Sequence, residues 1–200
     1  MTQESMFRTS TAALFVSALL ISIYHRHKAD MIGGRVSWQE EGLLTVVLLR
    51  VCGLAAWLSV LTYLLNPHWM QWSSLHLPSW LRWCGVPLGV VTLPLIYWVF
   101  ISIGHNITPT VTTRKDHQLV TTGAYRWVRH PLYSVGSLFF VALNLLVANW
   151  FVGIACFLGL IMILVRLPKE EAILIKRFGD EYRAYRKCIG RLLPRISSPP

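Results

Sequence analysis

Two polar segments hold most of the side chains that could bind a charged ligand. Residues 123–133 read GAYRWVRHPLY and place two arginines and a histidine among aromatic rings, directly before a long apolar run. Pro131 suits the first turn of a helix because its missing N–H would have no partner there. His130 would then be the N-cap, and the first-turn N–H groups could bind an anion such as a carboxylate. A basic and aromatic membrane anchor is the alternative interpretation, and composition alone favours it.

The second segment, residues 166–195, reads RLPKEEAILIKRFGDEYRAYRKCIGRLLPR. Pro168 predicts the start of a helix with Glu170 and Glu171 in its first turn, where the helix dipole favours acids. Gly179 predicts the end of that helix, and Asp180 would cap a further short one. An interfacial amphipathic helix would also explain the basic and apolar residues. It would not explain paired acids beside an anionic membrane surface, so we expect a cationic partner close to them.

The composition indicates a membrane protein. Of the 200 residues, 54% are hydrophobic and only 14% are charged, well below the charged fraction of soluble domains. The net charge of +10 indicates cytoplasmic loops rich in lysine and arginine rather than a nucleic-acid partner. The four cysteines have neither CxxC nor Cys/His metal spacing, which predicts no zinc site and no disulfide framework. The N-terminus lacks the features of a signal peptide, so we expect the first apolar segment to be retained.

Five apolar stretches predict an all-α, polytopic membrane helix bundle with five transmembrane helices and a cytoplasmic helical tail. A bilayer core needs about 20 helical residues. The last two stretches meet at Ala148-Asn149-Trp150, which predicts a tight helical hairpin. We divide the chain into a three-span region, 1–104, and a catalytic region, 105–200. The stretches cover residues 10–24, 43–65, 84–104, 131–147 and 148–166.

The basic residues predict the orientation of these spans. Loop 25–42 holds three lysines or arginines, loop 105–130 holds four and the tail from Arg166 holds nine, whereas the opposite face has only Arg8 and Arg82. Positively charged loops stay on the cytoplasmic side, so the N-terminus is predicted outside and the C-terminus in the cytoplasm. Arg50 lies inside the second span, and we expect it to face the bundle interior, a cavity or an acidic partner.

The strings DHQLVTTGAYRWVRHPLY and RLPKEEAILIKRFGDEYRAYRKCIGRLLP resemble the isoprenylcysteine carboxyl methyltransferase family, which belongs to a wider membrane group with the phospholipid N-methyltransferases. The resemblance covers about residues 104–195. It implies a pocket for S-adenosylmethionine between the last two spans and the tail. Arg166 matches an arginine that contacts the substrate. The positions that match cofactor contacts are His117, Gln118, Leu119, Val120, Tyr125, His130, Pro131, Leu132, Tyr133 and Glu170.

The same resemblance implies methyl esterification of the carboxylate of an isoprenylcysteine-like lipid, either a small molecule or a prenylated protein. Membrane lipids would surround the enzyme, in a bacterial inner membrane or the endoplasmic reticulum. Three alternatives remain open at this point. A phospholipid N-methyltransferase would need a proton acceptor, for which His130, His117 or Glu171 could serve. A reductase would use NADPH, and a non-catalytic membrane module would use these residues only as anchors.

Overall fold

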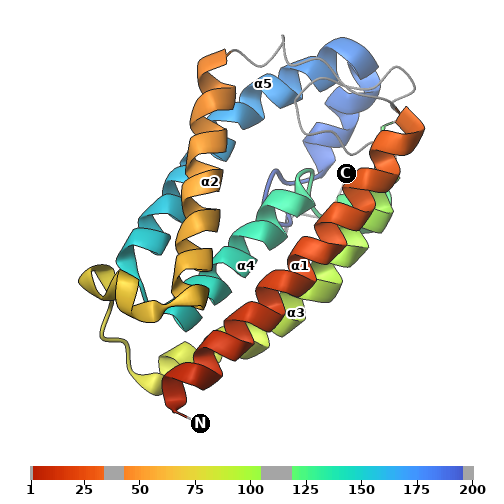
Figure 1. Ribbon diagram of the computed structural model, residues 1–200. Helices are drawn as coiled ribbons and strands as arrows, with labels where there is room; N and C mark the ends of the chain where they lie inside the picture. The colour runs from red at the N-terminus through yellow and green to blue at the C-terminus, as the bar shows by residue number, and fades with distance from the viewer. Residues whose placement is uncertain (1, 34–42, 105–118, 196–200) are drawn as a thin grey trace.

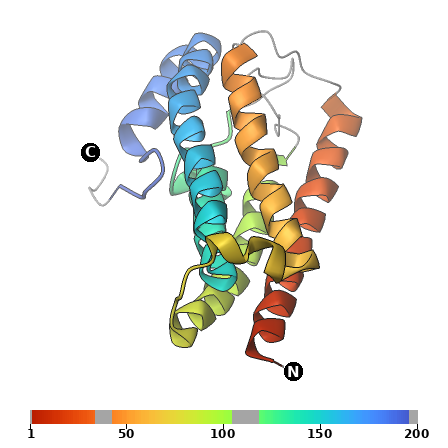
Figure 2. The same ribbon diagram turned by 60° about the vertical axis from the view of Figure 1, so that its left-hand side comes forward.

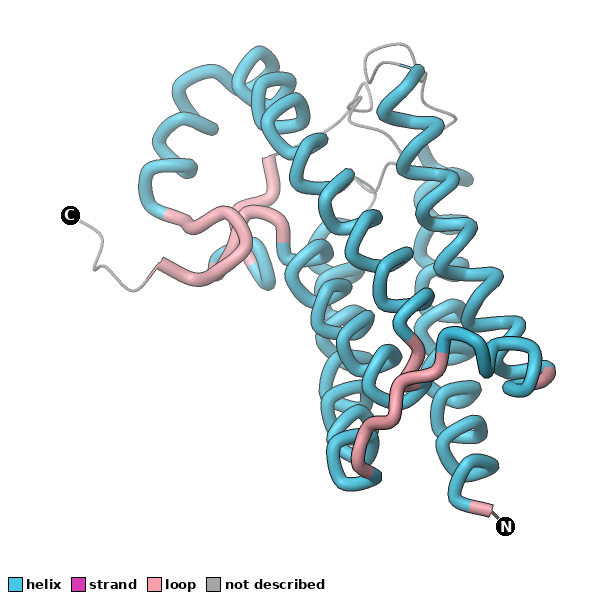
Figure 3. The backbone as a smooth tube through the Cα atoms, turned by 90° about the vertical axis from the view of Figure 1, so that its left-hand side faces the viewer, coloured by secondary structure: helices cyan, strands magenta, loops and turns pink. Residues whose placement is uncertain are grey.

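A computed structural model describes residues 2–33, 43–104 and 119–195 of the chain (Figure 1). Within these residues the secondary structure is helical, with no strand (Figure 3). The elements in chain order are α1 (Gln3–Gly33), α2 (Leu43–Leu65), η1 (Pro67–Ser73), α3 (Ser79–Ile103), η3 (Gly123–Arg126), α4 (Pro131–Val147) and α5 (Trp150–Cys188).

The helices have the lengths and the apolar composition of membrane spans. Among the described residues, α1, α2, α3 and α5 are long and apolar enough to cross a bilayer. Helix α4 is equally apolar but has 17 residues, the lower limit for a span. In lipid a helix satisfies its own backbone hydrogen bonds, which is why these sequences adopt it. The predicted all-α bundle of an integral, multi-pass membrane protein is confirmed.

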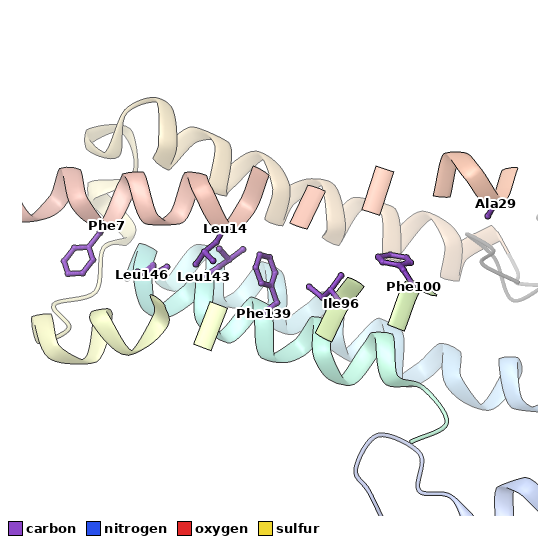
Figure 4. Close-up of a cluster of buried hydrophobic side chains, with 8 residues drawn as sticks. All are labelled: Phe7, Leu14, Ala29, Ile96, Phe100, Phe139, Leu143 and Leu146. Carbon is purple, nitrogen blue, oxygen red and sulfur yellow. The ribbon is translucent and has the colours of Figure 1, made fainter. Parts of the chain in front are cut away.

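One hydrophobic core joins α1, α3 and α4, which run side by side (Figures 1 and 4). The core contains Phe7 and Leu14 of α1, Phe100 of α3 and Leu143 of α4, and all four side chains are buried. Leu14 lies beside Leu143, whereas Phe7 and Phe100 lie toward opposite ends of the cluster (Figure 4). Gly85 allows α3 to approach α4 closely, because a Cβ there would lie 2.7 Å from the carbonyl oxygen of Ala142. Small residues commonly permit such close contacts between membrane helices.

A second cluster joins α2, η1 and the start of α5. Ala148 adopts a left-handed conformation, with φ 50° and ψ 55°, and so turns the chain sharply from α4 into α5. Asn149 caps α5 by accepting from the backbone N–H groups of Phe151 and Val152. Its side-chain amide also donates to the carbonyl of Met70 in η1, at 3.1 Å. The amide therefore ties this turn to the short helix that crosses the start of α5 (Figure 2).

The predicted tight hairpin is correct at its turn but wrong along its helices. Helix α4 packs mainly against α3, whereas α5 packs mainly against α2, so the two helices diverge from Asn149 (Figure 1). Their contact is limited because each has a larger apolar partner elsewhere in the bundle. This divergence leaves room for a cavity between them.

Helix α5 also extends further than predicted. It continues through Pro168 to a bend at Gly179 and ends at Cys188. The part before the bend is about 43 Å long, which exceeds the bilayer core. Its backbone leaves helical geometry at Gly179, with φ 56° and ψ −125°, where the sequence predicted a helix end. The helix bends there, and its last part and the following tail turn back toward the start of α4 (Figure 1).

Arg8 and Arg82, the two arginines predicted on the face opposite the basic loops, bind groups of other helices, whereas Arg50 is exposed. Arg82 forms an ion pair with Glu4 at 2.8 Å and donates to the carbonyl of Leu146, so it joins α1, α3 and α4 at the end where the chain starts. Arg8 donates to the carbonyl of Leu64. Arg50 is exposed on α2, so it does not lie in the bundle interior, and a cavity or an acidic partner for it stays a prediction.

Candidate active site

The start of α4 is covered by the C-terminal tail. Helix α4 begins at Pro131 with His130 as its N-cap, as the sequence predicts. The backbone N–H of Arg129 donates to the carbonyl of Gly190 at 2.9 Å, and that of His130 donates to the carbonyl of Arg191 at 3.1 Å. The hydroxyl of Ser134 donates to the carbonyl of Leu192 at 2.6 Å. The tail thus crosses the start of α4, and backbone hydrogen bonds contribute to holding it there.

The start of α4 has fewer free backbone N–H donors for an anion than the sequence predicts. Pro131 has no N–H, and the N–H groups of Tyr133 and Ser134 both donate to the carbonyl of His130. Few donors of the first turn are left for a carboxylate. An anion beside this helix end would therefore depend on side chains, of which the tail supplies Arg191 and Arg186.

Glu171 is the centre of an ion cluster that fixes the tail. Its side chain is 2% exposed, and its carboxylate accepts from Arg129 at 2.8 Å and 3.1 Å. Arg191 donates to the same carboxylate at 2.6 Å and 3.1 Å, and this hydrogen bonding raises the pKa of Arg191. Arg129 also donates to the carbonyls of Arg186 and Ile189. The cationic partner that the sequence led us to expect beside the acid pair is confirmed.

Glu170 has a different environment from its neighbour. Its side chain is 23% exposed, and it accepts a hydrogen bond from the hydroxyl of Tyr133 at 3.0 Å. The Nδ1 atom of His130 lies 3.7 Å from Glu170 Oε1, while its Nε2 atom lies 3.5 Å from Glu171 Oε1. The rings of His130 and Tyr133 stack with their centroids 5.7 Å apart. His130, Tyr133 and Glu170, from two separate segments, therefore face one another.

Tyr125 completes the aromatic side of this site. Gly123, with φ 60°, starts the short helix η3, and the N–H of Ala124 donates to Ser102 Oγ of α3 at 3.1 Å. Tyr185 in the bent end of α5 donates its hydroxyl to the carbonyl of Tyr125 at 2.6 Å. Burial raises the pKa of Tyr125, as do the nearby Glu170 and Tyr133, so its phenol stays neutral. A neutral ring can stack on a base or contact a cation.

Arg166 lies one helical turn before Glu170, on the same side of α5. Residues four apart share a helix face, so its guanidinium and the Glu170 carboxylate belong to one surface. Its side chain is buried, with the whole residue 7% exposed. Arg26 of α1 lies within electrostatic range of both Arg166 and Tyr133. Arg166 thus brings a guanidinium group close to the Glu170 carboxylate, and such a group can bind an anion.

A cavity of about 650 Å³ occupies the space between the diverging α4 and α5, with α1 and α3 closing it. Most of its walls are apolar, and Tyr133 lies among its lining residues. Several lining positions are exposed to the cavity or to lipid, for example Phe140 and Phe157. The cavity therefore connects an apolar volume in the membrane part of the bundle with the polar site around Tyr133.

The predicted site residues fall into three groups. The structure brings Tyr125, His130, Tyr133 and Glu170 together, and it places Pro131 and Leu132 in the first turn beside them, with Leu132 lining the cavity. Leu119 and Val120 are half-buried, and their part in binding stays a prediction. His117 and Gln118 lie outside the described residues.

Sequence reasoning did not assign Glu171, Arg129 and Arg191 to the site. Glu171 could have been suspected, because the sequence offered no reason for a second acid beside Glu170. Nothing in the sequence indicated which arginines would reach it, because the partners are 42 and 20 residues away along the chain.

Comparison with known proteins connects this geometry to one family. The sequence model of the isoprenylcysteine carboxyl methyltransferase family matches residues 85–176. The protein-S-isoprenylcysteine O-methyltransferase of Homo sapiens is 30% identical over 128 residues, which cover 62% of this chain and 45% of the relative. The Schizosaccharomyces pombe enzyme of the same name is 35% identical over 101 residues, 48% of this chain and 42% of the relative. The chain spans about half the length of these relatives.

Two further comparisons cover more of the chain. Protein-S-isoprenylcysteine O-methyltransferase B of Arabidopsis thaliana is 25% identical over 166 residues, 78% of this chain and 79% of the relative. The solved structure of a eukaryotic intramembrane Ras methyltransferase aligns with a TM-score of 0.55 and 18% identity. That alignment covers 94% of this chain and 68% of the solved chain, and it shows that the two share a fold.

Proposed function

We propose that this chain, whose residues 85–176 match the sequence model of the isoprenylcysteine carboxyl methyltransferase family, is a membrane methyltransferase that uses S-adenosylmethionine. The proposed acceptor is a lipid that ends in a carboxylate, such as an isoprenylcysteine, and the product is its methyl ester. The names of the matching relatives support this reaction, and the site contains side chains suited to it.

The proposal is carried by one observation, the different environments of Glu170 and Glu171. Glu171 is paired with Arg129 and Arg191, has Arg186 at 3.9 Å and is excluded from water, so its charge is used within the protein. Glu170 has a neutral phenol as its hydrogen-bond donor and is partly exposed. Its carboxylate can therefore accept from an ammonium group or from ribose hydroxyls, both of which S-adenosylmethionine contains.

The surrounding side chains fit the other parts of this cofactor. Tyr125, Tyr133 and His130 offer ring faces to an adenine or to a cation, an attraction of about 0.5–2 kcal/mol per cation–ring contact. Arg191 or Arg186 would hold a carboxylate in place of the N–H groups at the start of α4. When bound, the cofactor supplies a methyl group on a positively charged sulfur. The leucine and valine at 119 and 120, together with His117 and Gln118, are proposed to line the same pocket, as the resemblance implies.

Methyl transfer to a carboxylate requires the protein mainly to align the acceptor oxygen with the methyl group. A carboxylate is already ionised and nucleophilic at neutral pH, so no side chain has to remove a proton. Arg166 would hold the acceptor carboxylate by charge-assisted hydrogen bonds and direct one oxygen toward the methyl group. Correct alignment and exclusion of water can lower the barrier by about 7–11 kcal/mol in favourable cases.

The apolar cavity between α4 and α5 is the proposed binding place of the lipid chain. It reaches Tyr133 at the polar site, so a lipid lying in it would place its head group beside Arg166 and Glu170. A volume of about 650 Å³ is in the range of pockets that bind lipids and drug-sized ligands. The lipid would enter from the bilayer, while the cofactor would enter from the aqueous side.

We place that aqueous side in the cytoplasm, with the N-terminus outside, in a bacterial inner membrane or the endoplasmic reticulum. The start of α1 lies at the opposite end of the bundle from the bent end of α5 and its arginines (Figures 1 and 2). The arginine-rich end is the one that the charge rule assigns to the cytoplasm.

An amine acceptor is the second candidate, because His130 lies between two carboxylates and could take up the proton that an ammonium group must lose. Membranes containing the protein are incubated with methyl-labelled S-adenosylmethionine and either a farnesylcysteine or an aminophospholipid. We expect a label on farnesylcysteine that base releases as volatile methanol. A base-stable label on the aminophospholipid would show N-methylation instead of ester formation. No label on either acceptor would refute both proposed reactions.

A further inference from the structure

Arg26 of α1 lies on the wall of the apolar cavity, far in sequence from the matched family region. We infer that Arg26 binds the carboxylate of the acceptor together with Arg166, and so makes the cavity selective for lipids with an anionic end. The inference rests on the proposed function, because it names the chemical group that the acceptor presents at the same site.

The polar groups of the cavity are gathered toward its two ends. Ser22, Arg26 and Tyr133 mark one end, Asn144 and Asn149 mark the other, and apolar residues such as Ile96 and Phe157 line the walls between the two ends. Among the lining residues that belong to the described part of the chain, Arg26 is the one that carries a full charge. A ligand that fits such a cavity has a long apolar part and one anionic end.

Arg26 lies in the polar last part of α1, where it is exposed and also lines the cavity. Charged side chains that face a cavity in a membrane protein commonly mark a substrate path. Arg26 Nε donates to Ser22 Oγ at 3.2 Å, which uses one of its five N–H donors. Asp30, one turn further along α1, contributes a negative charge in its vicinity.

Two guanidinium groups from different helices face the same region. Arg26 and Tyr133 line the same cavity, and the Tyr133 hydroxyl donates to Glu170, which lies one turn beyond Arg166 on α5. A carboxylate at this end of the cavity could accept hydrogen bonds from both guanidinium groups. Tyr133 would place that carboxylate next to Glu170 and hence next to the proposed cofactor.

The test compares two lipids that differ only in this charge. The full chain is placed in phosphatidylcholine nanodiscs, and the affinities of N-acetyl-S-farnesylcysteine and its carboxamide are measured by competition against a radiolabelled farnesyl ligand. The variants are Arg26→Gln and, as a matched control, Lys28→Gln, which removes an exposed charge from the same helix and does not line the cavity. Affinity for S-adenosylmethionine is measured for each protein as an independent check of the site.

We expect the wild type and Lys28→Gln to prefer the acid over the amide. Arg26→Gln should bind the acid about tenfold more weakly, as for the loss of one charge-assisted hydrogen bond, and should bind the amide and S-adenosylmethionine as the wild type does. Equal affinities of the wild type for acid and amide, including no binding of either, would overturn the inference, as would an unchanged preference in Arg26→Gln. Failure of S-adenosylmethionine to bind would instead refute the proposed function. The affinities for the acid and the amide could still be compared in that case.

Discussion

Replacing Glu171 by glutamine is predicted to release the C-terminal tail from α4. The glutamine keeps the size of the side chain but removes the charge that Arg129 and Arg191 share. The tail would then keep its backbone hydrogen bonds to Arg129 and His130 but lose the ion cluster that holds the two segments together.

The size of this effect follows from burial. Glu171 is 2% exposed and Arg129 is 8% exposed, so this pair is buried, and removing one partner of a buried pair costs about 3–5 kcal/mol. Arg191 is 40% exposed and can turn to water, so its loss adds little. Local opening of the tail should therefore become roughly a hundredfold to a few thousandfold more frequent.

Amide hydrogen exchange of residues 182–192 measures this opening directly. The matched control is Asp180→Asn, because Asp180 is 96% exposed and its pair with Arg183 lies at the surface. Exchange in the control should equal that of the wild type. If Glu171→Gln exchanges no faster than the control, then the ion cluster does not hold the tail and the reasoning from burial is refuted.

Three further changes test the fold and the acceptor site. Asn149→Ala removes a helix cap and leaves buried partners without a hydrogen bond, so thermal unfolding should show a loss of about 2–3 kcal/mol; an unchanged midpoint would contradict the role of the amide. Gly85→Leu should separate α3 from α4 and lower the unfolding midpoint, by about 1–3 kcal/mol, because its Cβ would meet the Ala142 carbonyl; equal stability would show that α3 can move away freely. Arg166→Gln should raise the KM for the acceptor about tenfold or more and leave cofactor affinity nearly unchanged; the reverse pattern would assign Arg166 to the cofactor.

The sequence predicted the helices well because their signals are local. Apolar length fixes the spans, Pro131 fixes the start of α4, and the left-handed Gly179 marks the bend in α5. Pro168 gave a wrong prediction, since a proline can lie within a long membrane helix when neighbouring groups satisfy the backbone that it frees. Whether a proline starts or only interrupts a helix depends on packing, which the local sequence does not contain.

The candidate site was predictable where one segment held several of its groups. His130 and Tyr133 are three residues apart, and a helix start brings them together. Residue chemistry alone did not separate the roles of the acid pair, because Glu170 and Glu171 are adjacent and chemically alike; the resemblance alone singled out Glu170. Their difference arises from the tail that folds back over α4 and brings Arg191 to one of them. The cavity and Arg26 depend on the divergence of α4 and α5, which results from contacts with other helices.

The most direct test of the account is the affinity of S-adenosylmethionine for the wild type and for Glu170→Gln, with Asp180→Asn as control. Thermal stabilisation by mass action reports binding in detergent, and NADPH serves as the competing cofactor. We predict that S-adenosylmethionine stabilises the wild type and the control, that NADPH does not, and that Glu170→Gln binds about 10- to 150-fold more weakly. Stabilisation by NADPH alone, or equal affinity in Glu170→Gln, would contradict the claim that this carboxylate holds the cofactor of a methyltransferase.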